Sequence, residues 1–227
     1  MVAAPRLQAQ QGELKSMKNS MIRYILNVST KKTPIKSIDI VKQCLRGEQK
    51  MFLQLLPHVQ EILSDVYGLQ FNEVKEKTGK FYLVTSEFAP GSEFEWTVRQ
   101  REDNRLLFIV LSYIFMKGGK VIEPVLFGFL KKLHIEDEPH EYFGHFKKTI
   151  TETFVKQLFL KKEKIEMEAG NIEERFQYSW GHRADLEFKK RDCLEYVAQL
   201  LKRQPSSFSA QFEECNSDDE DVEMAEQ

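Results

Sequence analysis

An apolar run near the middle of the chain, Leu106–Met116, predicts the helix around which the rest of the chain packs. Within this run only Ser112 and Tyr113 carry a polar side-chain atom. A helix here would be apolar on all sides and must therefore be enclosed by protein. It is well short of the ~20 residues that a membrane-spanning helix needs, and Gly118-Gly119 ends it. We therefore expect a buried helix at the centre of a compact helical core.

The pattern before this run indicates a winged helix. Apolar residues three or four positions apart predict helices over residues 14–28, 35–45 and 51–67. Pro57 lies inside the third helix, and we expect the regular part of that helix to begin only just before it. Two strand-like runs then predict a hairpin, 69–74 and 81–85 with a turn at Lys77–Lys80.

The same order repeats in the second half of the chain. After the central helix, a second helix over 123–133 and a polar connection, His134–Tyr142, precede a third helix. The capping-box pattern Thr149–Glu152 predicts that this third helix begins at Thr149. A second hairpin and a last helix are then predicted, at 159–165 and 172–180 with a turn at Ala169–Asn171, and at 189–202. The predicted fold class is mostly α with small β hairpins, arranged as tandem winged-helix domains.

These patterns divide the chain into five parts. We expect a disordered N-terminus (1–12), a first winged-helix unit (13–88) and a linker (89–100) that contains Pro90-Gly91-Ser92. A second winged-helix unit (101–205) and an acidic disordered tail (206–227) follow. The N-terminal residues contain no apolar segment of the kind found in signal peptides.

The net charge of −2 conceals an uneven distribution. The tail from Glu213 to Gln227 holds eight acidic residues and no Lys or Arg, so residues 1–212 hold 33 basic and 27 acidic residues, about +6. A folded part with a mild basic excess is compatible with a nucleic-acid partner. Three cysteines far apart in the sequence argue against a disulfide framework and for a reducing compartment.

Motifs that would indicate an enzyme are missing from the sequence. The five histidines form no H-E-x-x-H pattern and have no neighbouring cysteine cluster, so they do not predict a zinc site. Gly118-Gly119 lacks the Lys-[Ser/Thr] ending of a phosphate loop. Cys44 and Cys193 lie on apolar helix faces and are expected to be buried, and Glu136–Glu138 is expected to form a loop tip. We expect no catalytic residue, cofactor or metal.

Several short motifs resemble the MAGE (melanoma-antigen) homology domain family. In the second half they are Tyr113–Gly118, Phe143-Gly144 with Lys147-Lys148, Ile150–Glu152, Phe154-Val155, and Tyr178 with Trp180-Gly181 and Arg183. In the first half they are Pro34–Lys36, Asp39-Ile40 and Val66–Gly68. The resemblance covers roughly residues 14–204, and the Trp-Gly-x-Arg element is its most specific part. His182 stands where the family often has proline.

The resemblance implies tandem winged helices without catalytic activity, a RING-type ubiquitin ligase partner, a kleisin partner and contact with double-stranded DNA that is not sequence-specific. The short form of the chain resembles most the necdin-like, non-SMC element three subunits of the structural maintenance of chromosomes five/six complex, which implies a nuclear, chromosome-associated role in DNA repair and recombination without membrane contact. Two alternatives stay open: a general adaptor of another RING ligase, and a sequence-specific winged-helix transcription factor.

The resemblance also implies a ligase contact on the first helix, where the family carries a Leu-Leu pair and this chain has Ile25-Leu26. With Tyr24 before them, these residues are the predicted ligase contact. Burial of both in the core is the alternative, although the helix has more apolar residues than one core stripe needs. For the kleisin the predicted contacts are apolar residues of the second unit, namely Phe127, Leu130, Leu133, Phe154 and Leu158.

Basic residues predict that DNA would contact the second unit. The third helix of the first unit has no Lys or Arg from Gln54 to Tyr67, so that unit is interpreted as a protein-binding module. The predicted DNA contacts are Lys147, Lys148, Lys156, Lys161, Lys162, Lys164, Arg175, Lys189, Lys190 and Arg191. A solvated charged face is the alternative, because glutamates are interleaved with them.

Two further features have a structural and a functional interpretation. Phe176, Tyr178 and Trp180 alternate along one predicted strand; they are interpreted as core, with a base-stacking platform as the alternative. Ser217 precedes Asp218-Asp219-Glu220 and is a possible phosphorylation site for an acidophilic kinase, whereas a plain solubilising tail is the alternative.

Overall fold

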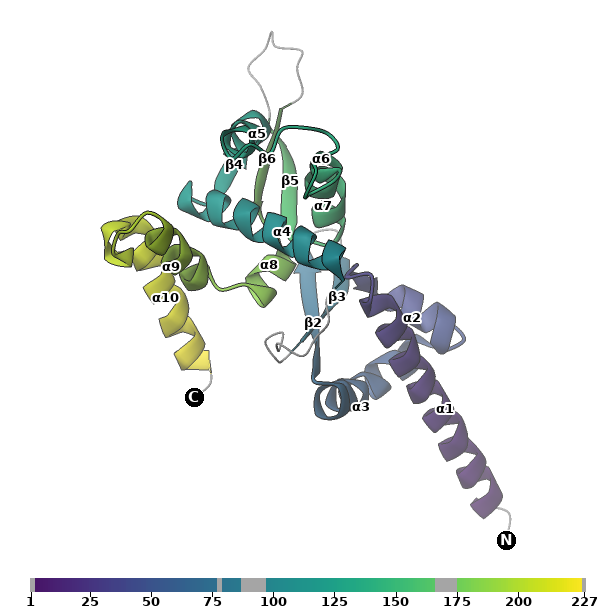
Figure 1. The fold of residues 1–227 in the computed structure, drawn as a ribbon. Coiled ribbons are helices and arrows are strands. Elements are labelled where there is room, and N and C mark those ends of the chain that lie inside the picture. Colours follow the sequence, from purple (N-terminus) through teal and green to yellow (C-terminus); the bar gives the residue numbers. More distant parts are fainter. Residues whose placement is uncertain (1–2, 77–78, 87–96, 166–174, 226–227) are drawn as a thin grey trace. The chain divides into compact units, whose positions relative to one another are not determined.

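The computed structural model describes residues 3–76, 79–86, 97–165 and 175–225. By their internal contacts these residues divide into two compact units, Met1–Phe94 and Glu95–Gln227. Each unit combines helices with one small three-stranded antiparallel sheet (Figure 1). The predicted fold class, mostly helical with two winged-helix hairpins, is confirmed.

The first unit contains three helices and a sheet. In chain order its elements are α1 (Ala3–Ser29), β1 (Ile35–Lys36), α2 (Ser37–Cys44), α3 (Gln49–Tyr67), β2 (Leu69–Glu76) and β3 (Gly79–Ser86). The strand order is β1-β3-β2, and the hairpin register runs from Leu69 opposite Ser86 to Glu76 opposite Gly79. This pairing confirms the predicted hairpin, although Lys77 and Thr78 of its turn lie outside the described residues.

The core of the first unit lies between α1, α3 and the sheet. Met21 and Ile25 of α1 are fully buried, as are Val59 and Leu63 of α3. On the sheet side the Tyr82 ring stacks on Phe71 at 4.5 Å between centroids and meets Phe52 edge-on at 5.8 Å. The Tyr82 hydroxyl donates a hydrogen bond to Glu73. Burial of the ring, with this bond to a carboxylate, raises the pKa of Tyr82 to about 12.

The second unit repeats this order and extends it. Its elements are α4 (Val98–Met116), β4 (Lys120–Ile122), α5 (Glu123–Lys132), α6 (Phe146–Lys148), a π-helical turn (Thr149–Thr153), α7 (Phe154–Lys156), β5 (Leu160–Ile165), β6 (Arg175–Trp180), α8 (His182–Glu187), α9 (Lys190–Leu200), a 3₁₀ turn (Pro205–Ser207) and α10 (Ser209–Ala225). The strand order is β4-β6-β5. The predicted turn Ala169–Asn171 lies outside the described residues.

Helix α4 is the centre of the second core, as the apolar run predicted. Leu106, Val110, Leu111 and Ile114 are fully buried, and Leu107 is 1% exposed. Residues of α5, the α6–α7 segment and both hairpin strands pack around them. The capping box that begins α4 is formed by Thr97 and Gln100, and both residues precede the predicted apolar run, Leu106–Met116.

Two helix starts differ from the prediction. The helical segment of the second unit begins at Phe146, not at Thr149, because Phe146 is buried in the core and Thr149 then falls inside the segment. The Thr149 hydroxyl accepts a hydrogen bond from Arg99 instead of capping a helix. Helix α3 begins at Gln49 and continues through Pro57, which lies on an exposed face where water can satisfy the freed carbonyl.

Both ends of the chain have more regular structure than predicted. Helix α1 begins at Ala3 in a stretch rich in good helix formers, although residues 1–12 were expected to be disordered. Helix α10 covers most of the expected disordered tail, and its Cys215 is 2% exposed. The short elements β1, β4 and α8 were not predicted at all.

A tight corner at Trp180-Gly181 joins the hairpin of the second unit to the helices on either side. The Gly181 amide donates to the Phe159 carbonyl at 2.9 Å, and the Arg183 amide donates to the Leu158 carbonyl at 2.9 Å. A Cβ atom on Gly181 would lie 2.9 Å from the Leu158 carbonyl carbon and closer still to its oxygen. The corner therefore requires glycine because two backbone segments meet there.

Arg183 is the buried polar group of this corner. The residue is 1% exposed, its Nε donates to the Gln157 carbonyl at 3.0 Å, and its Nη1 lies 2.7 Å from Glu187 Oε1. The guanidinium also lies 5.7 Å from the centre of the Phe159 ring. Because a buried charge must be paired and hydrogen-bonded, Glu187 and Gln157 together make this position stable. The Trp-Gly-x-Arg motif is thus a structural element of the second unit.

We expect Gly181→Ala to lower the free energy of unfolding of the second unit by about 1–3 kcal/mol, since the added methyl group is forced against the Leu158 backbone. The matched control is Gly128→Ala on α5, where a Cβ meets nothing within 4 Å and a helix gains up to about 1 kcal/mol. Urea unfolding followed by tryptophan fluorescence measures both changes. Equal stability of the two variants would show that the corner is not tight.

Candidate partner-binding and nucleic-acid surfaces

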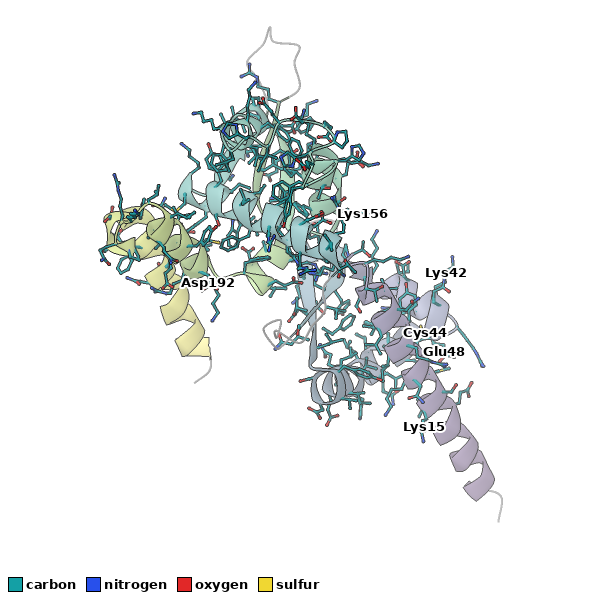
Figure 2. All side chains as sticks on the ribbon, viewed as in Figure 1. Lys15, Lys42, Cys44, Glu48, Lys156 and Asp192 are labelled. Carbon is teal, nitrogen blue, oxygen red and sulfur yellow. The ribbon has the colours of Figure 1, made fainter. Side chains whose placement is uncertain are left out.

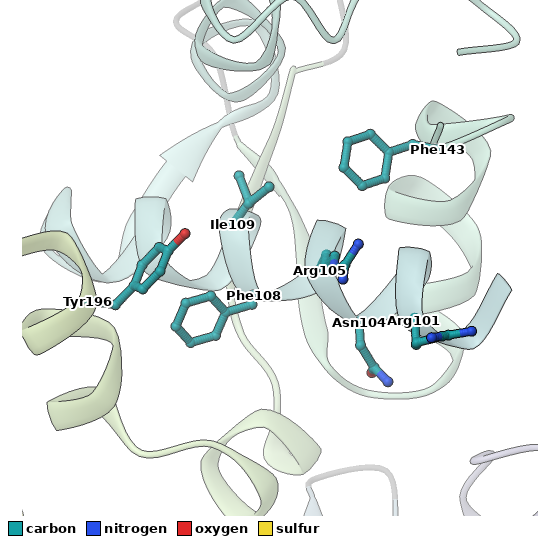
Figure 3. A pocket seen from close by; sticks show the side chains of 7 residues that line it. All are labelled: Arg101, Asn104, Arg105, Phe108, Ile109, Phe143 and Tyr196. Carbon is teal, nitrogen blue, oxygen red and sulfur yellow. The ribbon is translucent and has the colours of Figure 1, made fainter. Parts of the chain in front are cut away.

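A groove lies on the surface of the second unit. It has a volume of about 470 Å³ and is lined by one face of α4, the loop before α6 and one residue of α9, namely Arg101, Asn104, Arg105, Phe108, Ile109, Phe143 and Tyr196 (Figure 3). The apolar side chains form its floor and the two arginines lie toward one end. Every lining residue belongs to the second unit.

The groove is shaped by aromatic packing. The Phe108 and Tyr196 rings meet edge-on with centroids 5.1 Å apart, which connects α4 to α9. At the other end Arg105 donates a hydrogen bond to the Tyr142 hydroxyl, and its guanidinium lies 5.7 Å from the Tyr142 ring centre. An apolar floor with basic groups at one end suits an amphipathic helix that also carries acidic residues.

This groove was not predicted from the sequence. Two aromatic side chains that line it, Phe108 and Tyr196, are far apart in the sequence and meet only through the packing of α4 against α9. The one available signal was that α4 has apolar residues on all sides, more than its neighbours in the core can cover. Phe108 and Ile109 are only partly buried for this reason.

The predicted kleisin residues do not lie together on one surface. Leu130 and Phe154 are 0% and 2% exposed, so both belong to the core and offer no surface to a partner. Phe127 and Leu158 are partly buried, and Leu133 is 45% exposed. None of the five lines the groove. A contact with the kleisin stays a prediction for the three that retain exposed surface.

The predicted ligase residues of α1 divide between core and surface. Ile25 is fully buried against the rest of the first core. Tyr24 and Leu26, on either side of it, are only partly buried. Ile25 is therefore a core residue, and the predicted contact with a partner is left to Tyr24 and Leu26.

The ten predicted DNA-contacting residues fall into three groups in the second unit. Lys147, Lys148 and Lys156 are exposed on the α6–α7 segment, which packs against the N-terminal end of α4 through Arg99 (Figure 2 labels Lys156). Four residues lie on the hairpin strands, namely Lys161, Lys162, Lys164 and Arg175, and three at the start of α9, namely Lys189, Lys190 and Arg191. Figure 1 shows α6–α7 and α9 at opposite ends of α4. The ten do not form one continuous patch.

Several of these basic groups have acidic or polar partners. Lys161 lies 2.6 Å from Glu163, and Lys162 lies 3.6 Å from Glu123 and 4.1 Å from the Phe176 ring centre. Lys190 lies 2.7 Å from Glu214, and Arg191 donates to the Asn216 side chain at 2.9 Å. Within the described part of the chain Lys147, Lys148 and Lys156 form no ion pair. The α6–α7 group is therefore the best placed to meet phosphate.

The three aromatic residues of β6 belong to the packing of the sheet. Tyr178 is fully buried, and its hydroxyl donates to Glu123 at 2.6 Å; burial and this carboxylate both raise the pKa of Tyr178. The Trp180 indole donates to the Leu111 carbonyl at 2.9 Å. Phe176 is partly buried beneath Lys162. The interpretation of these residues as core is confirmed for Tyr178 and Trp180.

The described residues contain neither a cluster of metal ligands nor a helix that could span a membrane. They contain no group of three or more His, Cys, Asp or Glu side chains placed to hold a metal ion. None of their helices is both long enough and apolar enough to span a bilayer. Cys193 and Cys215 are buried free thiols, and burial raises the pKa of Cys193 to about 11, which keeps it protonated. Ser217 is exposed on α10 and stays a predicted modification site.

Comparison with known proteins identifies the family. The chain matches the MAGE homology domain over residues 21–89 and 80–191. It is 31% identical over 218 residues to the human non-structural maintenance of chromosomes element 3 homolog, covering 95% of this chain and 70% of that protein. It is 28% identical over 204 residues to human melanoma-associated antigen D2, covering 89% of this chain and 33% of that protein.

The solved structures agree with the sequence comparison. A chain of an Nse1-Nse3-Nse4 complex superposes with a TM-score of 0.81 at 29% sequence identity, covering 91% of this chain and 99% of that chain. The match extends over both winged-helix units, and the resemblance inferred from the short motifs is confirmed. The chain belongs to the MAGE homology domain family.

Proposed function

We propose that this chain is a non-enzymatic scaffold subunit of a chromosome-maintenance complex of the structural maintenance of chromosomes five/six type. The observation that supports this most is the match along nearly the whole chain, in sequence to an element 3 homolog and in structure to a chain of an Nse1-Nse3-Nse4 complex. The role places the protein in the nucleus, on chromosomes, during DNA repair and recombination.

The proposed ligase contact is the exposed side of α1. Tyr24 and Leu26 hold apolar surface there, while Ile25 between them fixes the helix to the first core. Helix α3 of the same unit has no Lys or Arg from Gln54 to Tyr67, which suits a protein partner better than phosphate. A RING-type ligase on this surface is the partner that the family resemblance implies.

For the kleisin we propose the groove between α4 and α9. Phe108 and Tyr196 provide an aromatic floor of the kind that dominates interface energetics, and Arg101 and Arg105 provide the basic end. The occupant is an amphipathic helix with aromatic or aliphatic anchors and an acidic flank. This assignment replaces the predicted contacts at Leu130 and Phe154, which are core residues.

For DNA we propose the α6–α7 group as the first contact. Its lysines are exposed and lie on the segment that corresponds to the third helix of a winged helix. Contacts of lysine to phosphate position a duplex without reading its sequence. We therefore propose binding to double-stranded DNA that is insensitive to sequence and steeply dependent on salt.

A second candidate is a general adaptor of another RING ligase, without a chromosome role. Human melanoma-associated antigen D2, which covers 89% of this chain at 28% identity, shows that the same domain occurs in longer proteins with other names. The two candidates differ in their associated proteins, because only the first requires a kleisin and a chromosome complex.

The ligase proposal is tested on neighbouring residues of α1. We expect Leu26→Asp to weaken capture of the RING subunit tenfold or more while leaving the melting temperature within a few degrees. Ile25→Ala should instead lower the free energy of unfolding by about 2–5 kcal/mol, since it empties a core position. Pull-down with the purified ligase subunit and thermal unfolding measure both. Undiminished capture by Leu26→Asp would contradict the contact.

A kleisin contact in the groove is tested at Tyr196, which is 44% exposed. We expect Tyr196→Ala to weaken binding of the kleisin's helical segment by about thirtyfold, the effect of a typical aromatic hot spot of about 2 kcal/mol. Leu200→Ala, one turn further along α9 and 63% exposed, is the matched control because Leu200 does not line the groove. Calorimetric titration gives both affinities, and equal losses would rule out the groove.

The proposed DNA contact is tested by reversing the α6–α7 charges. Lys147→Glu, Lys148→Glu and Lys156→Glu together should weaken binding to every duplex at least tenfold near 0.1 M salt and reduce the salt slope by about 2–3. Lys36→Glu, Lys42→Glu and Lys50→Glu make the same charge change at three exposed positions of the first unit. Gel-shift titrations over a salt series measure the effect; the same loss in both triple variants would contradict the proposal.

A further inference from the structure

Helix α10 is attached to the second unit by an apolar stripe. Phe208, Phe212 and Cys215 recur at intervals of four and three residues and so lie on one side of the helix and its lead-in. They pack on a cluster that includes Phe115 and Cys193, and Cys215 itself is 2% exposed. The stripe holds the helix against α9, beside which Figure 1 shows it.

The attachment also has polar contacts. The Gln211 side chain donates to the Met116 carbonyl, the last residue of α4, at 3.4 Å. On α9, Lys190 Nζ lies 2.7 Å from Glu214 Oε1, and Arg191 Nη2 donates to Asn216 Oδ1 at 2.9 Å. Consecutive basic residues of α9 are therefore both engaged by the same turn of α10.

These contacts have unequal roles. Exposed ion pairs contribute little to stability, and Lys190 and Glu214 keep 27% and 44% of their side-chain surface exposed. The apolar stripe is therefore what holds α10 in place. Glu214 and Asn216 instead decide what else can reach Lys190 and Arg191, because a phosphate group would need the same donor atoms.

The charge of α10 strengthens this effect. Glu213 and Glu214 are exposed on the helix, and the sequence that follows Ser217 is Asp218-Asp219-Glu220-Asp221. The Glu214 carboxylate beside the start of α9 repels a phosphate backbone over about one Debye length, ~8–10 Å at moderate salt. The α6–α7 lysines lie at the other end of α4 and are not covered by it.

We propose that α10 is a built-in acidic competitor that occupies the basic start of α9 and keeps duplex DNA from it. The inference rests on the proposed DNA contact and adds to it a second basic site, at the start of α9, whose access α10 controls. DNA can reach the α6–α7 lysines without hindrance. It can reach Lys190 and Arg191 only after α10 releases its contacts with them. Removing the carboxylate that pairs with Lys190, without disturbing the apolar stripe of α10, should add Lys190 to the DNA-binding surface and weaken the repulsion of phosphate around Arg191.

The test uses the full chain with Glu213→Gln and Glu214→Gln, which leave Phe208, Phe212 and Cys215 unchanged. Affinity for a random-sequence duplex is measured by fluorescence anisotropy over a salt series. We expect binding about fivefold tighter near 0.1 M salt and a salt slope steeper by about 1, because one more cation, Lys190, meets phosphate. Circular dichroism checks that the helix content is unchanged.

Two further variants separate competition from a general charge effect. Glu48→Gln with Glu61→Gln makes the same charge change in the first unit, at two exposed positions, and should leave affinity unchanged within twofold. Lys190→Ala with Arg191→Ala should have little effect in the unaltered chain but should abolish the gain when combined with the α10 variant. This non-additivity is the signature of competition for the same groups.

The outcomes are distinct. A gain that depends on Lys190 and Arg191 supports the competitor. An equal gain in the first-unit control, no gain in the α10 variant, or a gain that persists without Lys190 and Arg191 overturns it while leaving the proposed DNA contact intact. Absence of duplex binding by every variant at low salt overturns the DNA contact itself, and the competitor with it.

Discussion

The close approach of Gly181 to the Leu158 backbone is the constraint on which the second unit depends. At this point the end of the hairpin passes so near to the start of β5 that no side chain fits between them. Three backbone and side-chain bonds from Gly181 and Arg183 fasten the corner to residues 157–159. The corner thereby fixes the α6–α7 segment, the hairpin and α8 relative to one another, and with them the positions of the exposed lysines.

The two units share one frame and use it differently. Each has a short strand before its second helix, paired with the second hairpin strand, which becomes the central strand of the sheet, so the sheet orders β1-β3-β2 and β4-β6-β5 are equivalent. In the first unit the third helix bears no Lys or Arg between Gln54 and Tyr67. In the second the equivalent segment bears three exposed lysines. The same frame therefore carries a different surface chemistry in each unit.

The sequence predicted the fold best where the need to bury apolar residues allows few alternative structures. The apolar run at Leu106–Met116 has one stable environment, and the hairpins followed from alternation and turn residues. Strands of two and three residues, β1 and β4, give no periodic signal and exist only through pairing with a hairpin. The capping-box pattern at Thr149 was misleading because the burial of Phe146 decides where that helix begins.

Surfaces were harder to predict than the fold, for a physical reason. Periodicity shows which residues share a face but not which faces meet, so the groove between Phe108 and Tyr196 was missed and Leu130 was assigned to a partner when it belongs to the core. The ten basic residues were predicted on three elements of the second unit, but their acidic partners could not be predicted from the sequence. The contact of Glu214 with Lys190 depends on α10 folding back on α9, which the acidic composition of the tail concealed.

The central claim is that this chain works by holding other macromolecules together in a chromosome complex. Affinity purification of the tagged full chain from nuclear extract, followed by mass spectrometry of the proteins retained at moderate salt, tests it most directly. The account predicts a RING-type ligase subunit, a kleisin and chromosome-complex subunits in near-equal amounts. Recovery of a RING ligase without a kleisin or any chromosome-complex subunit would contradict it.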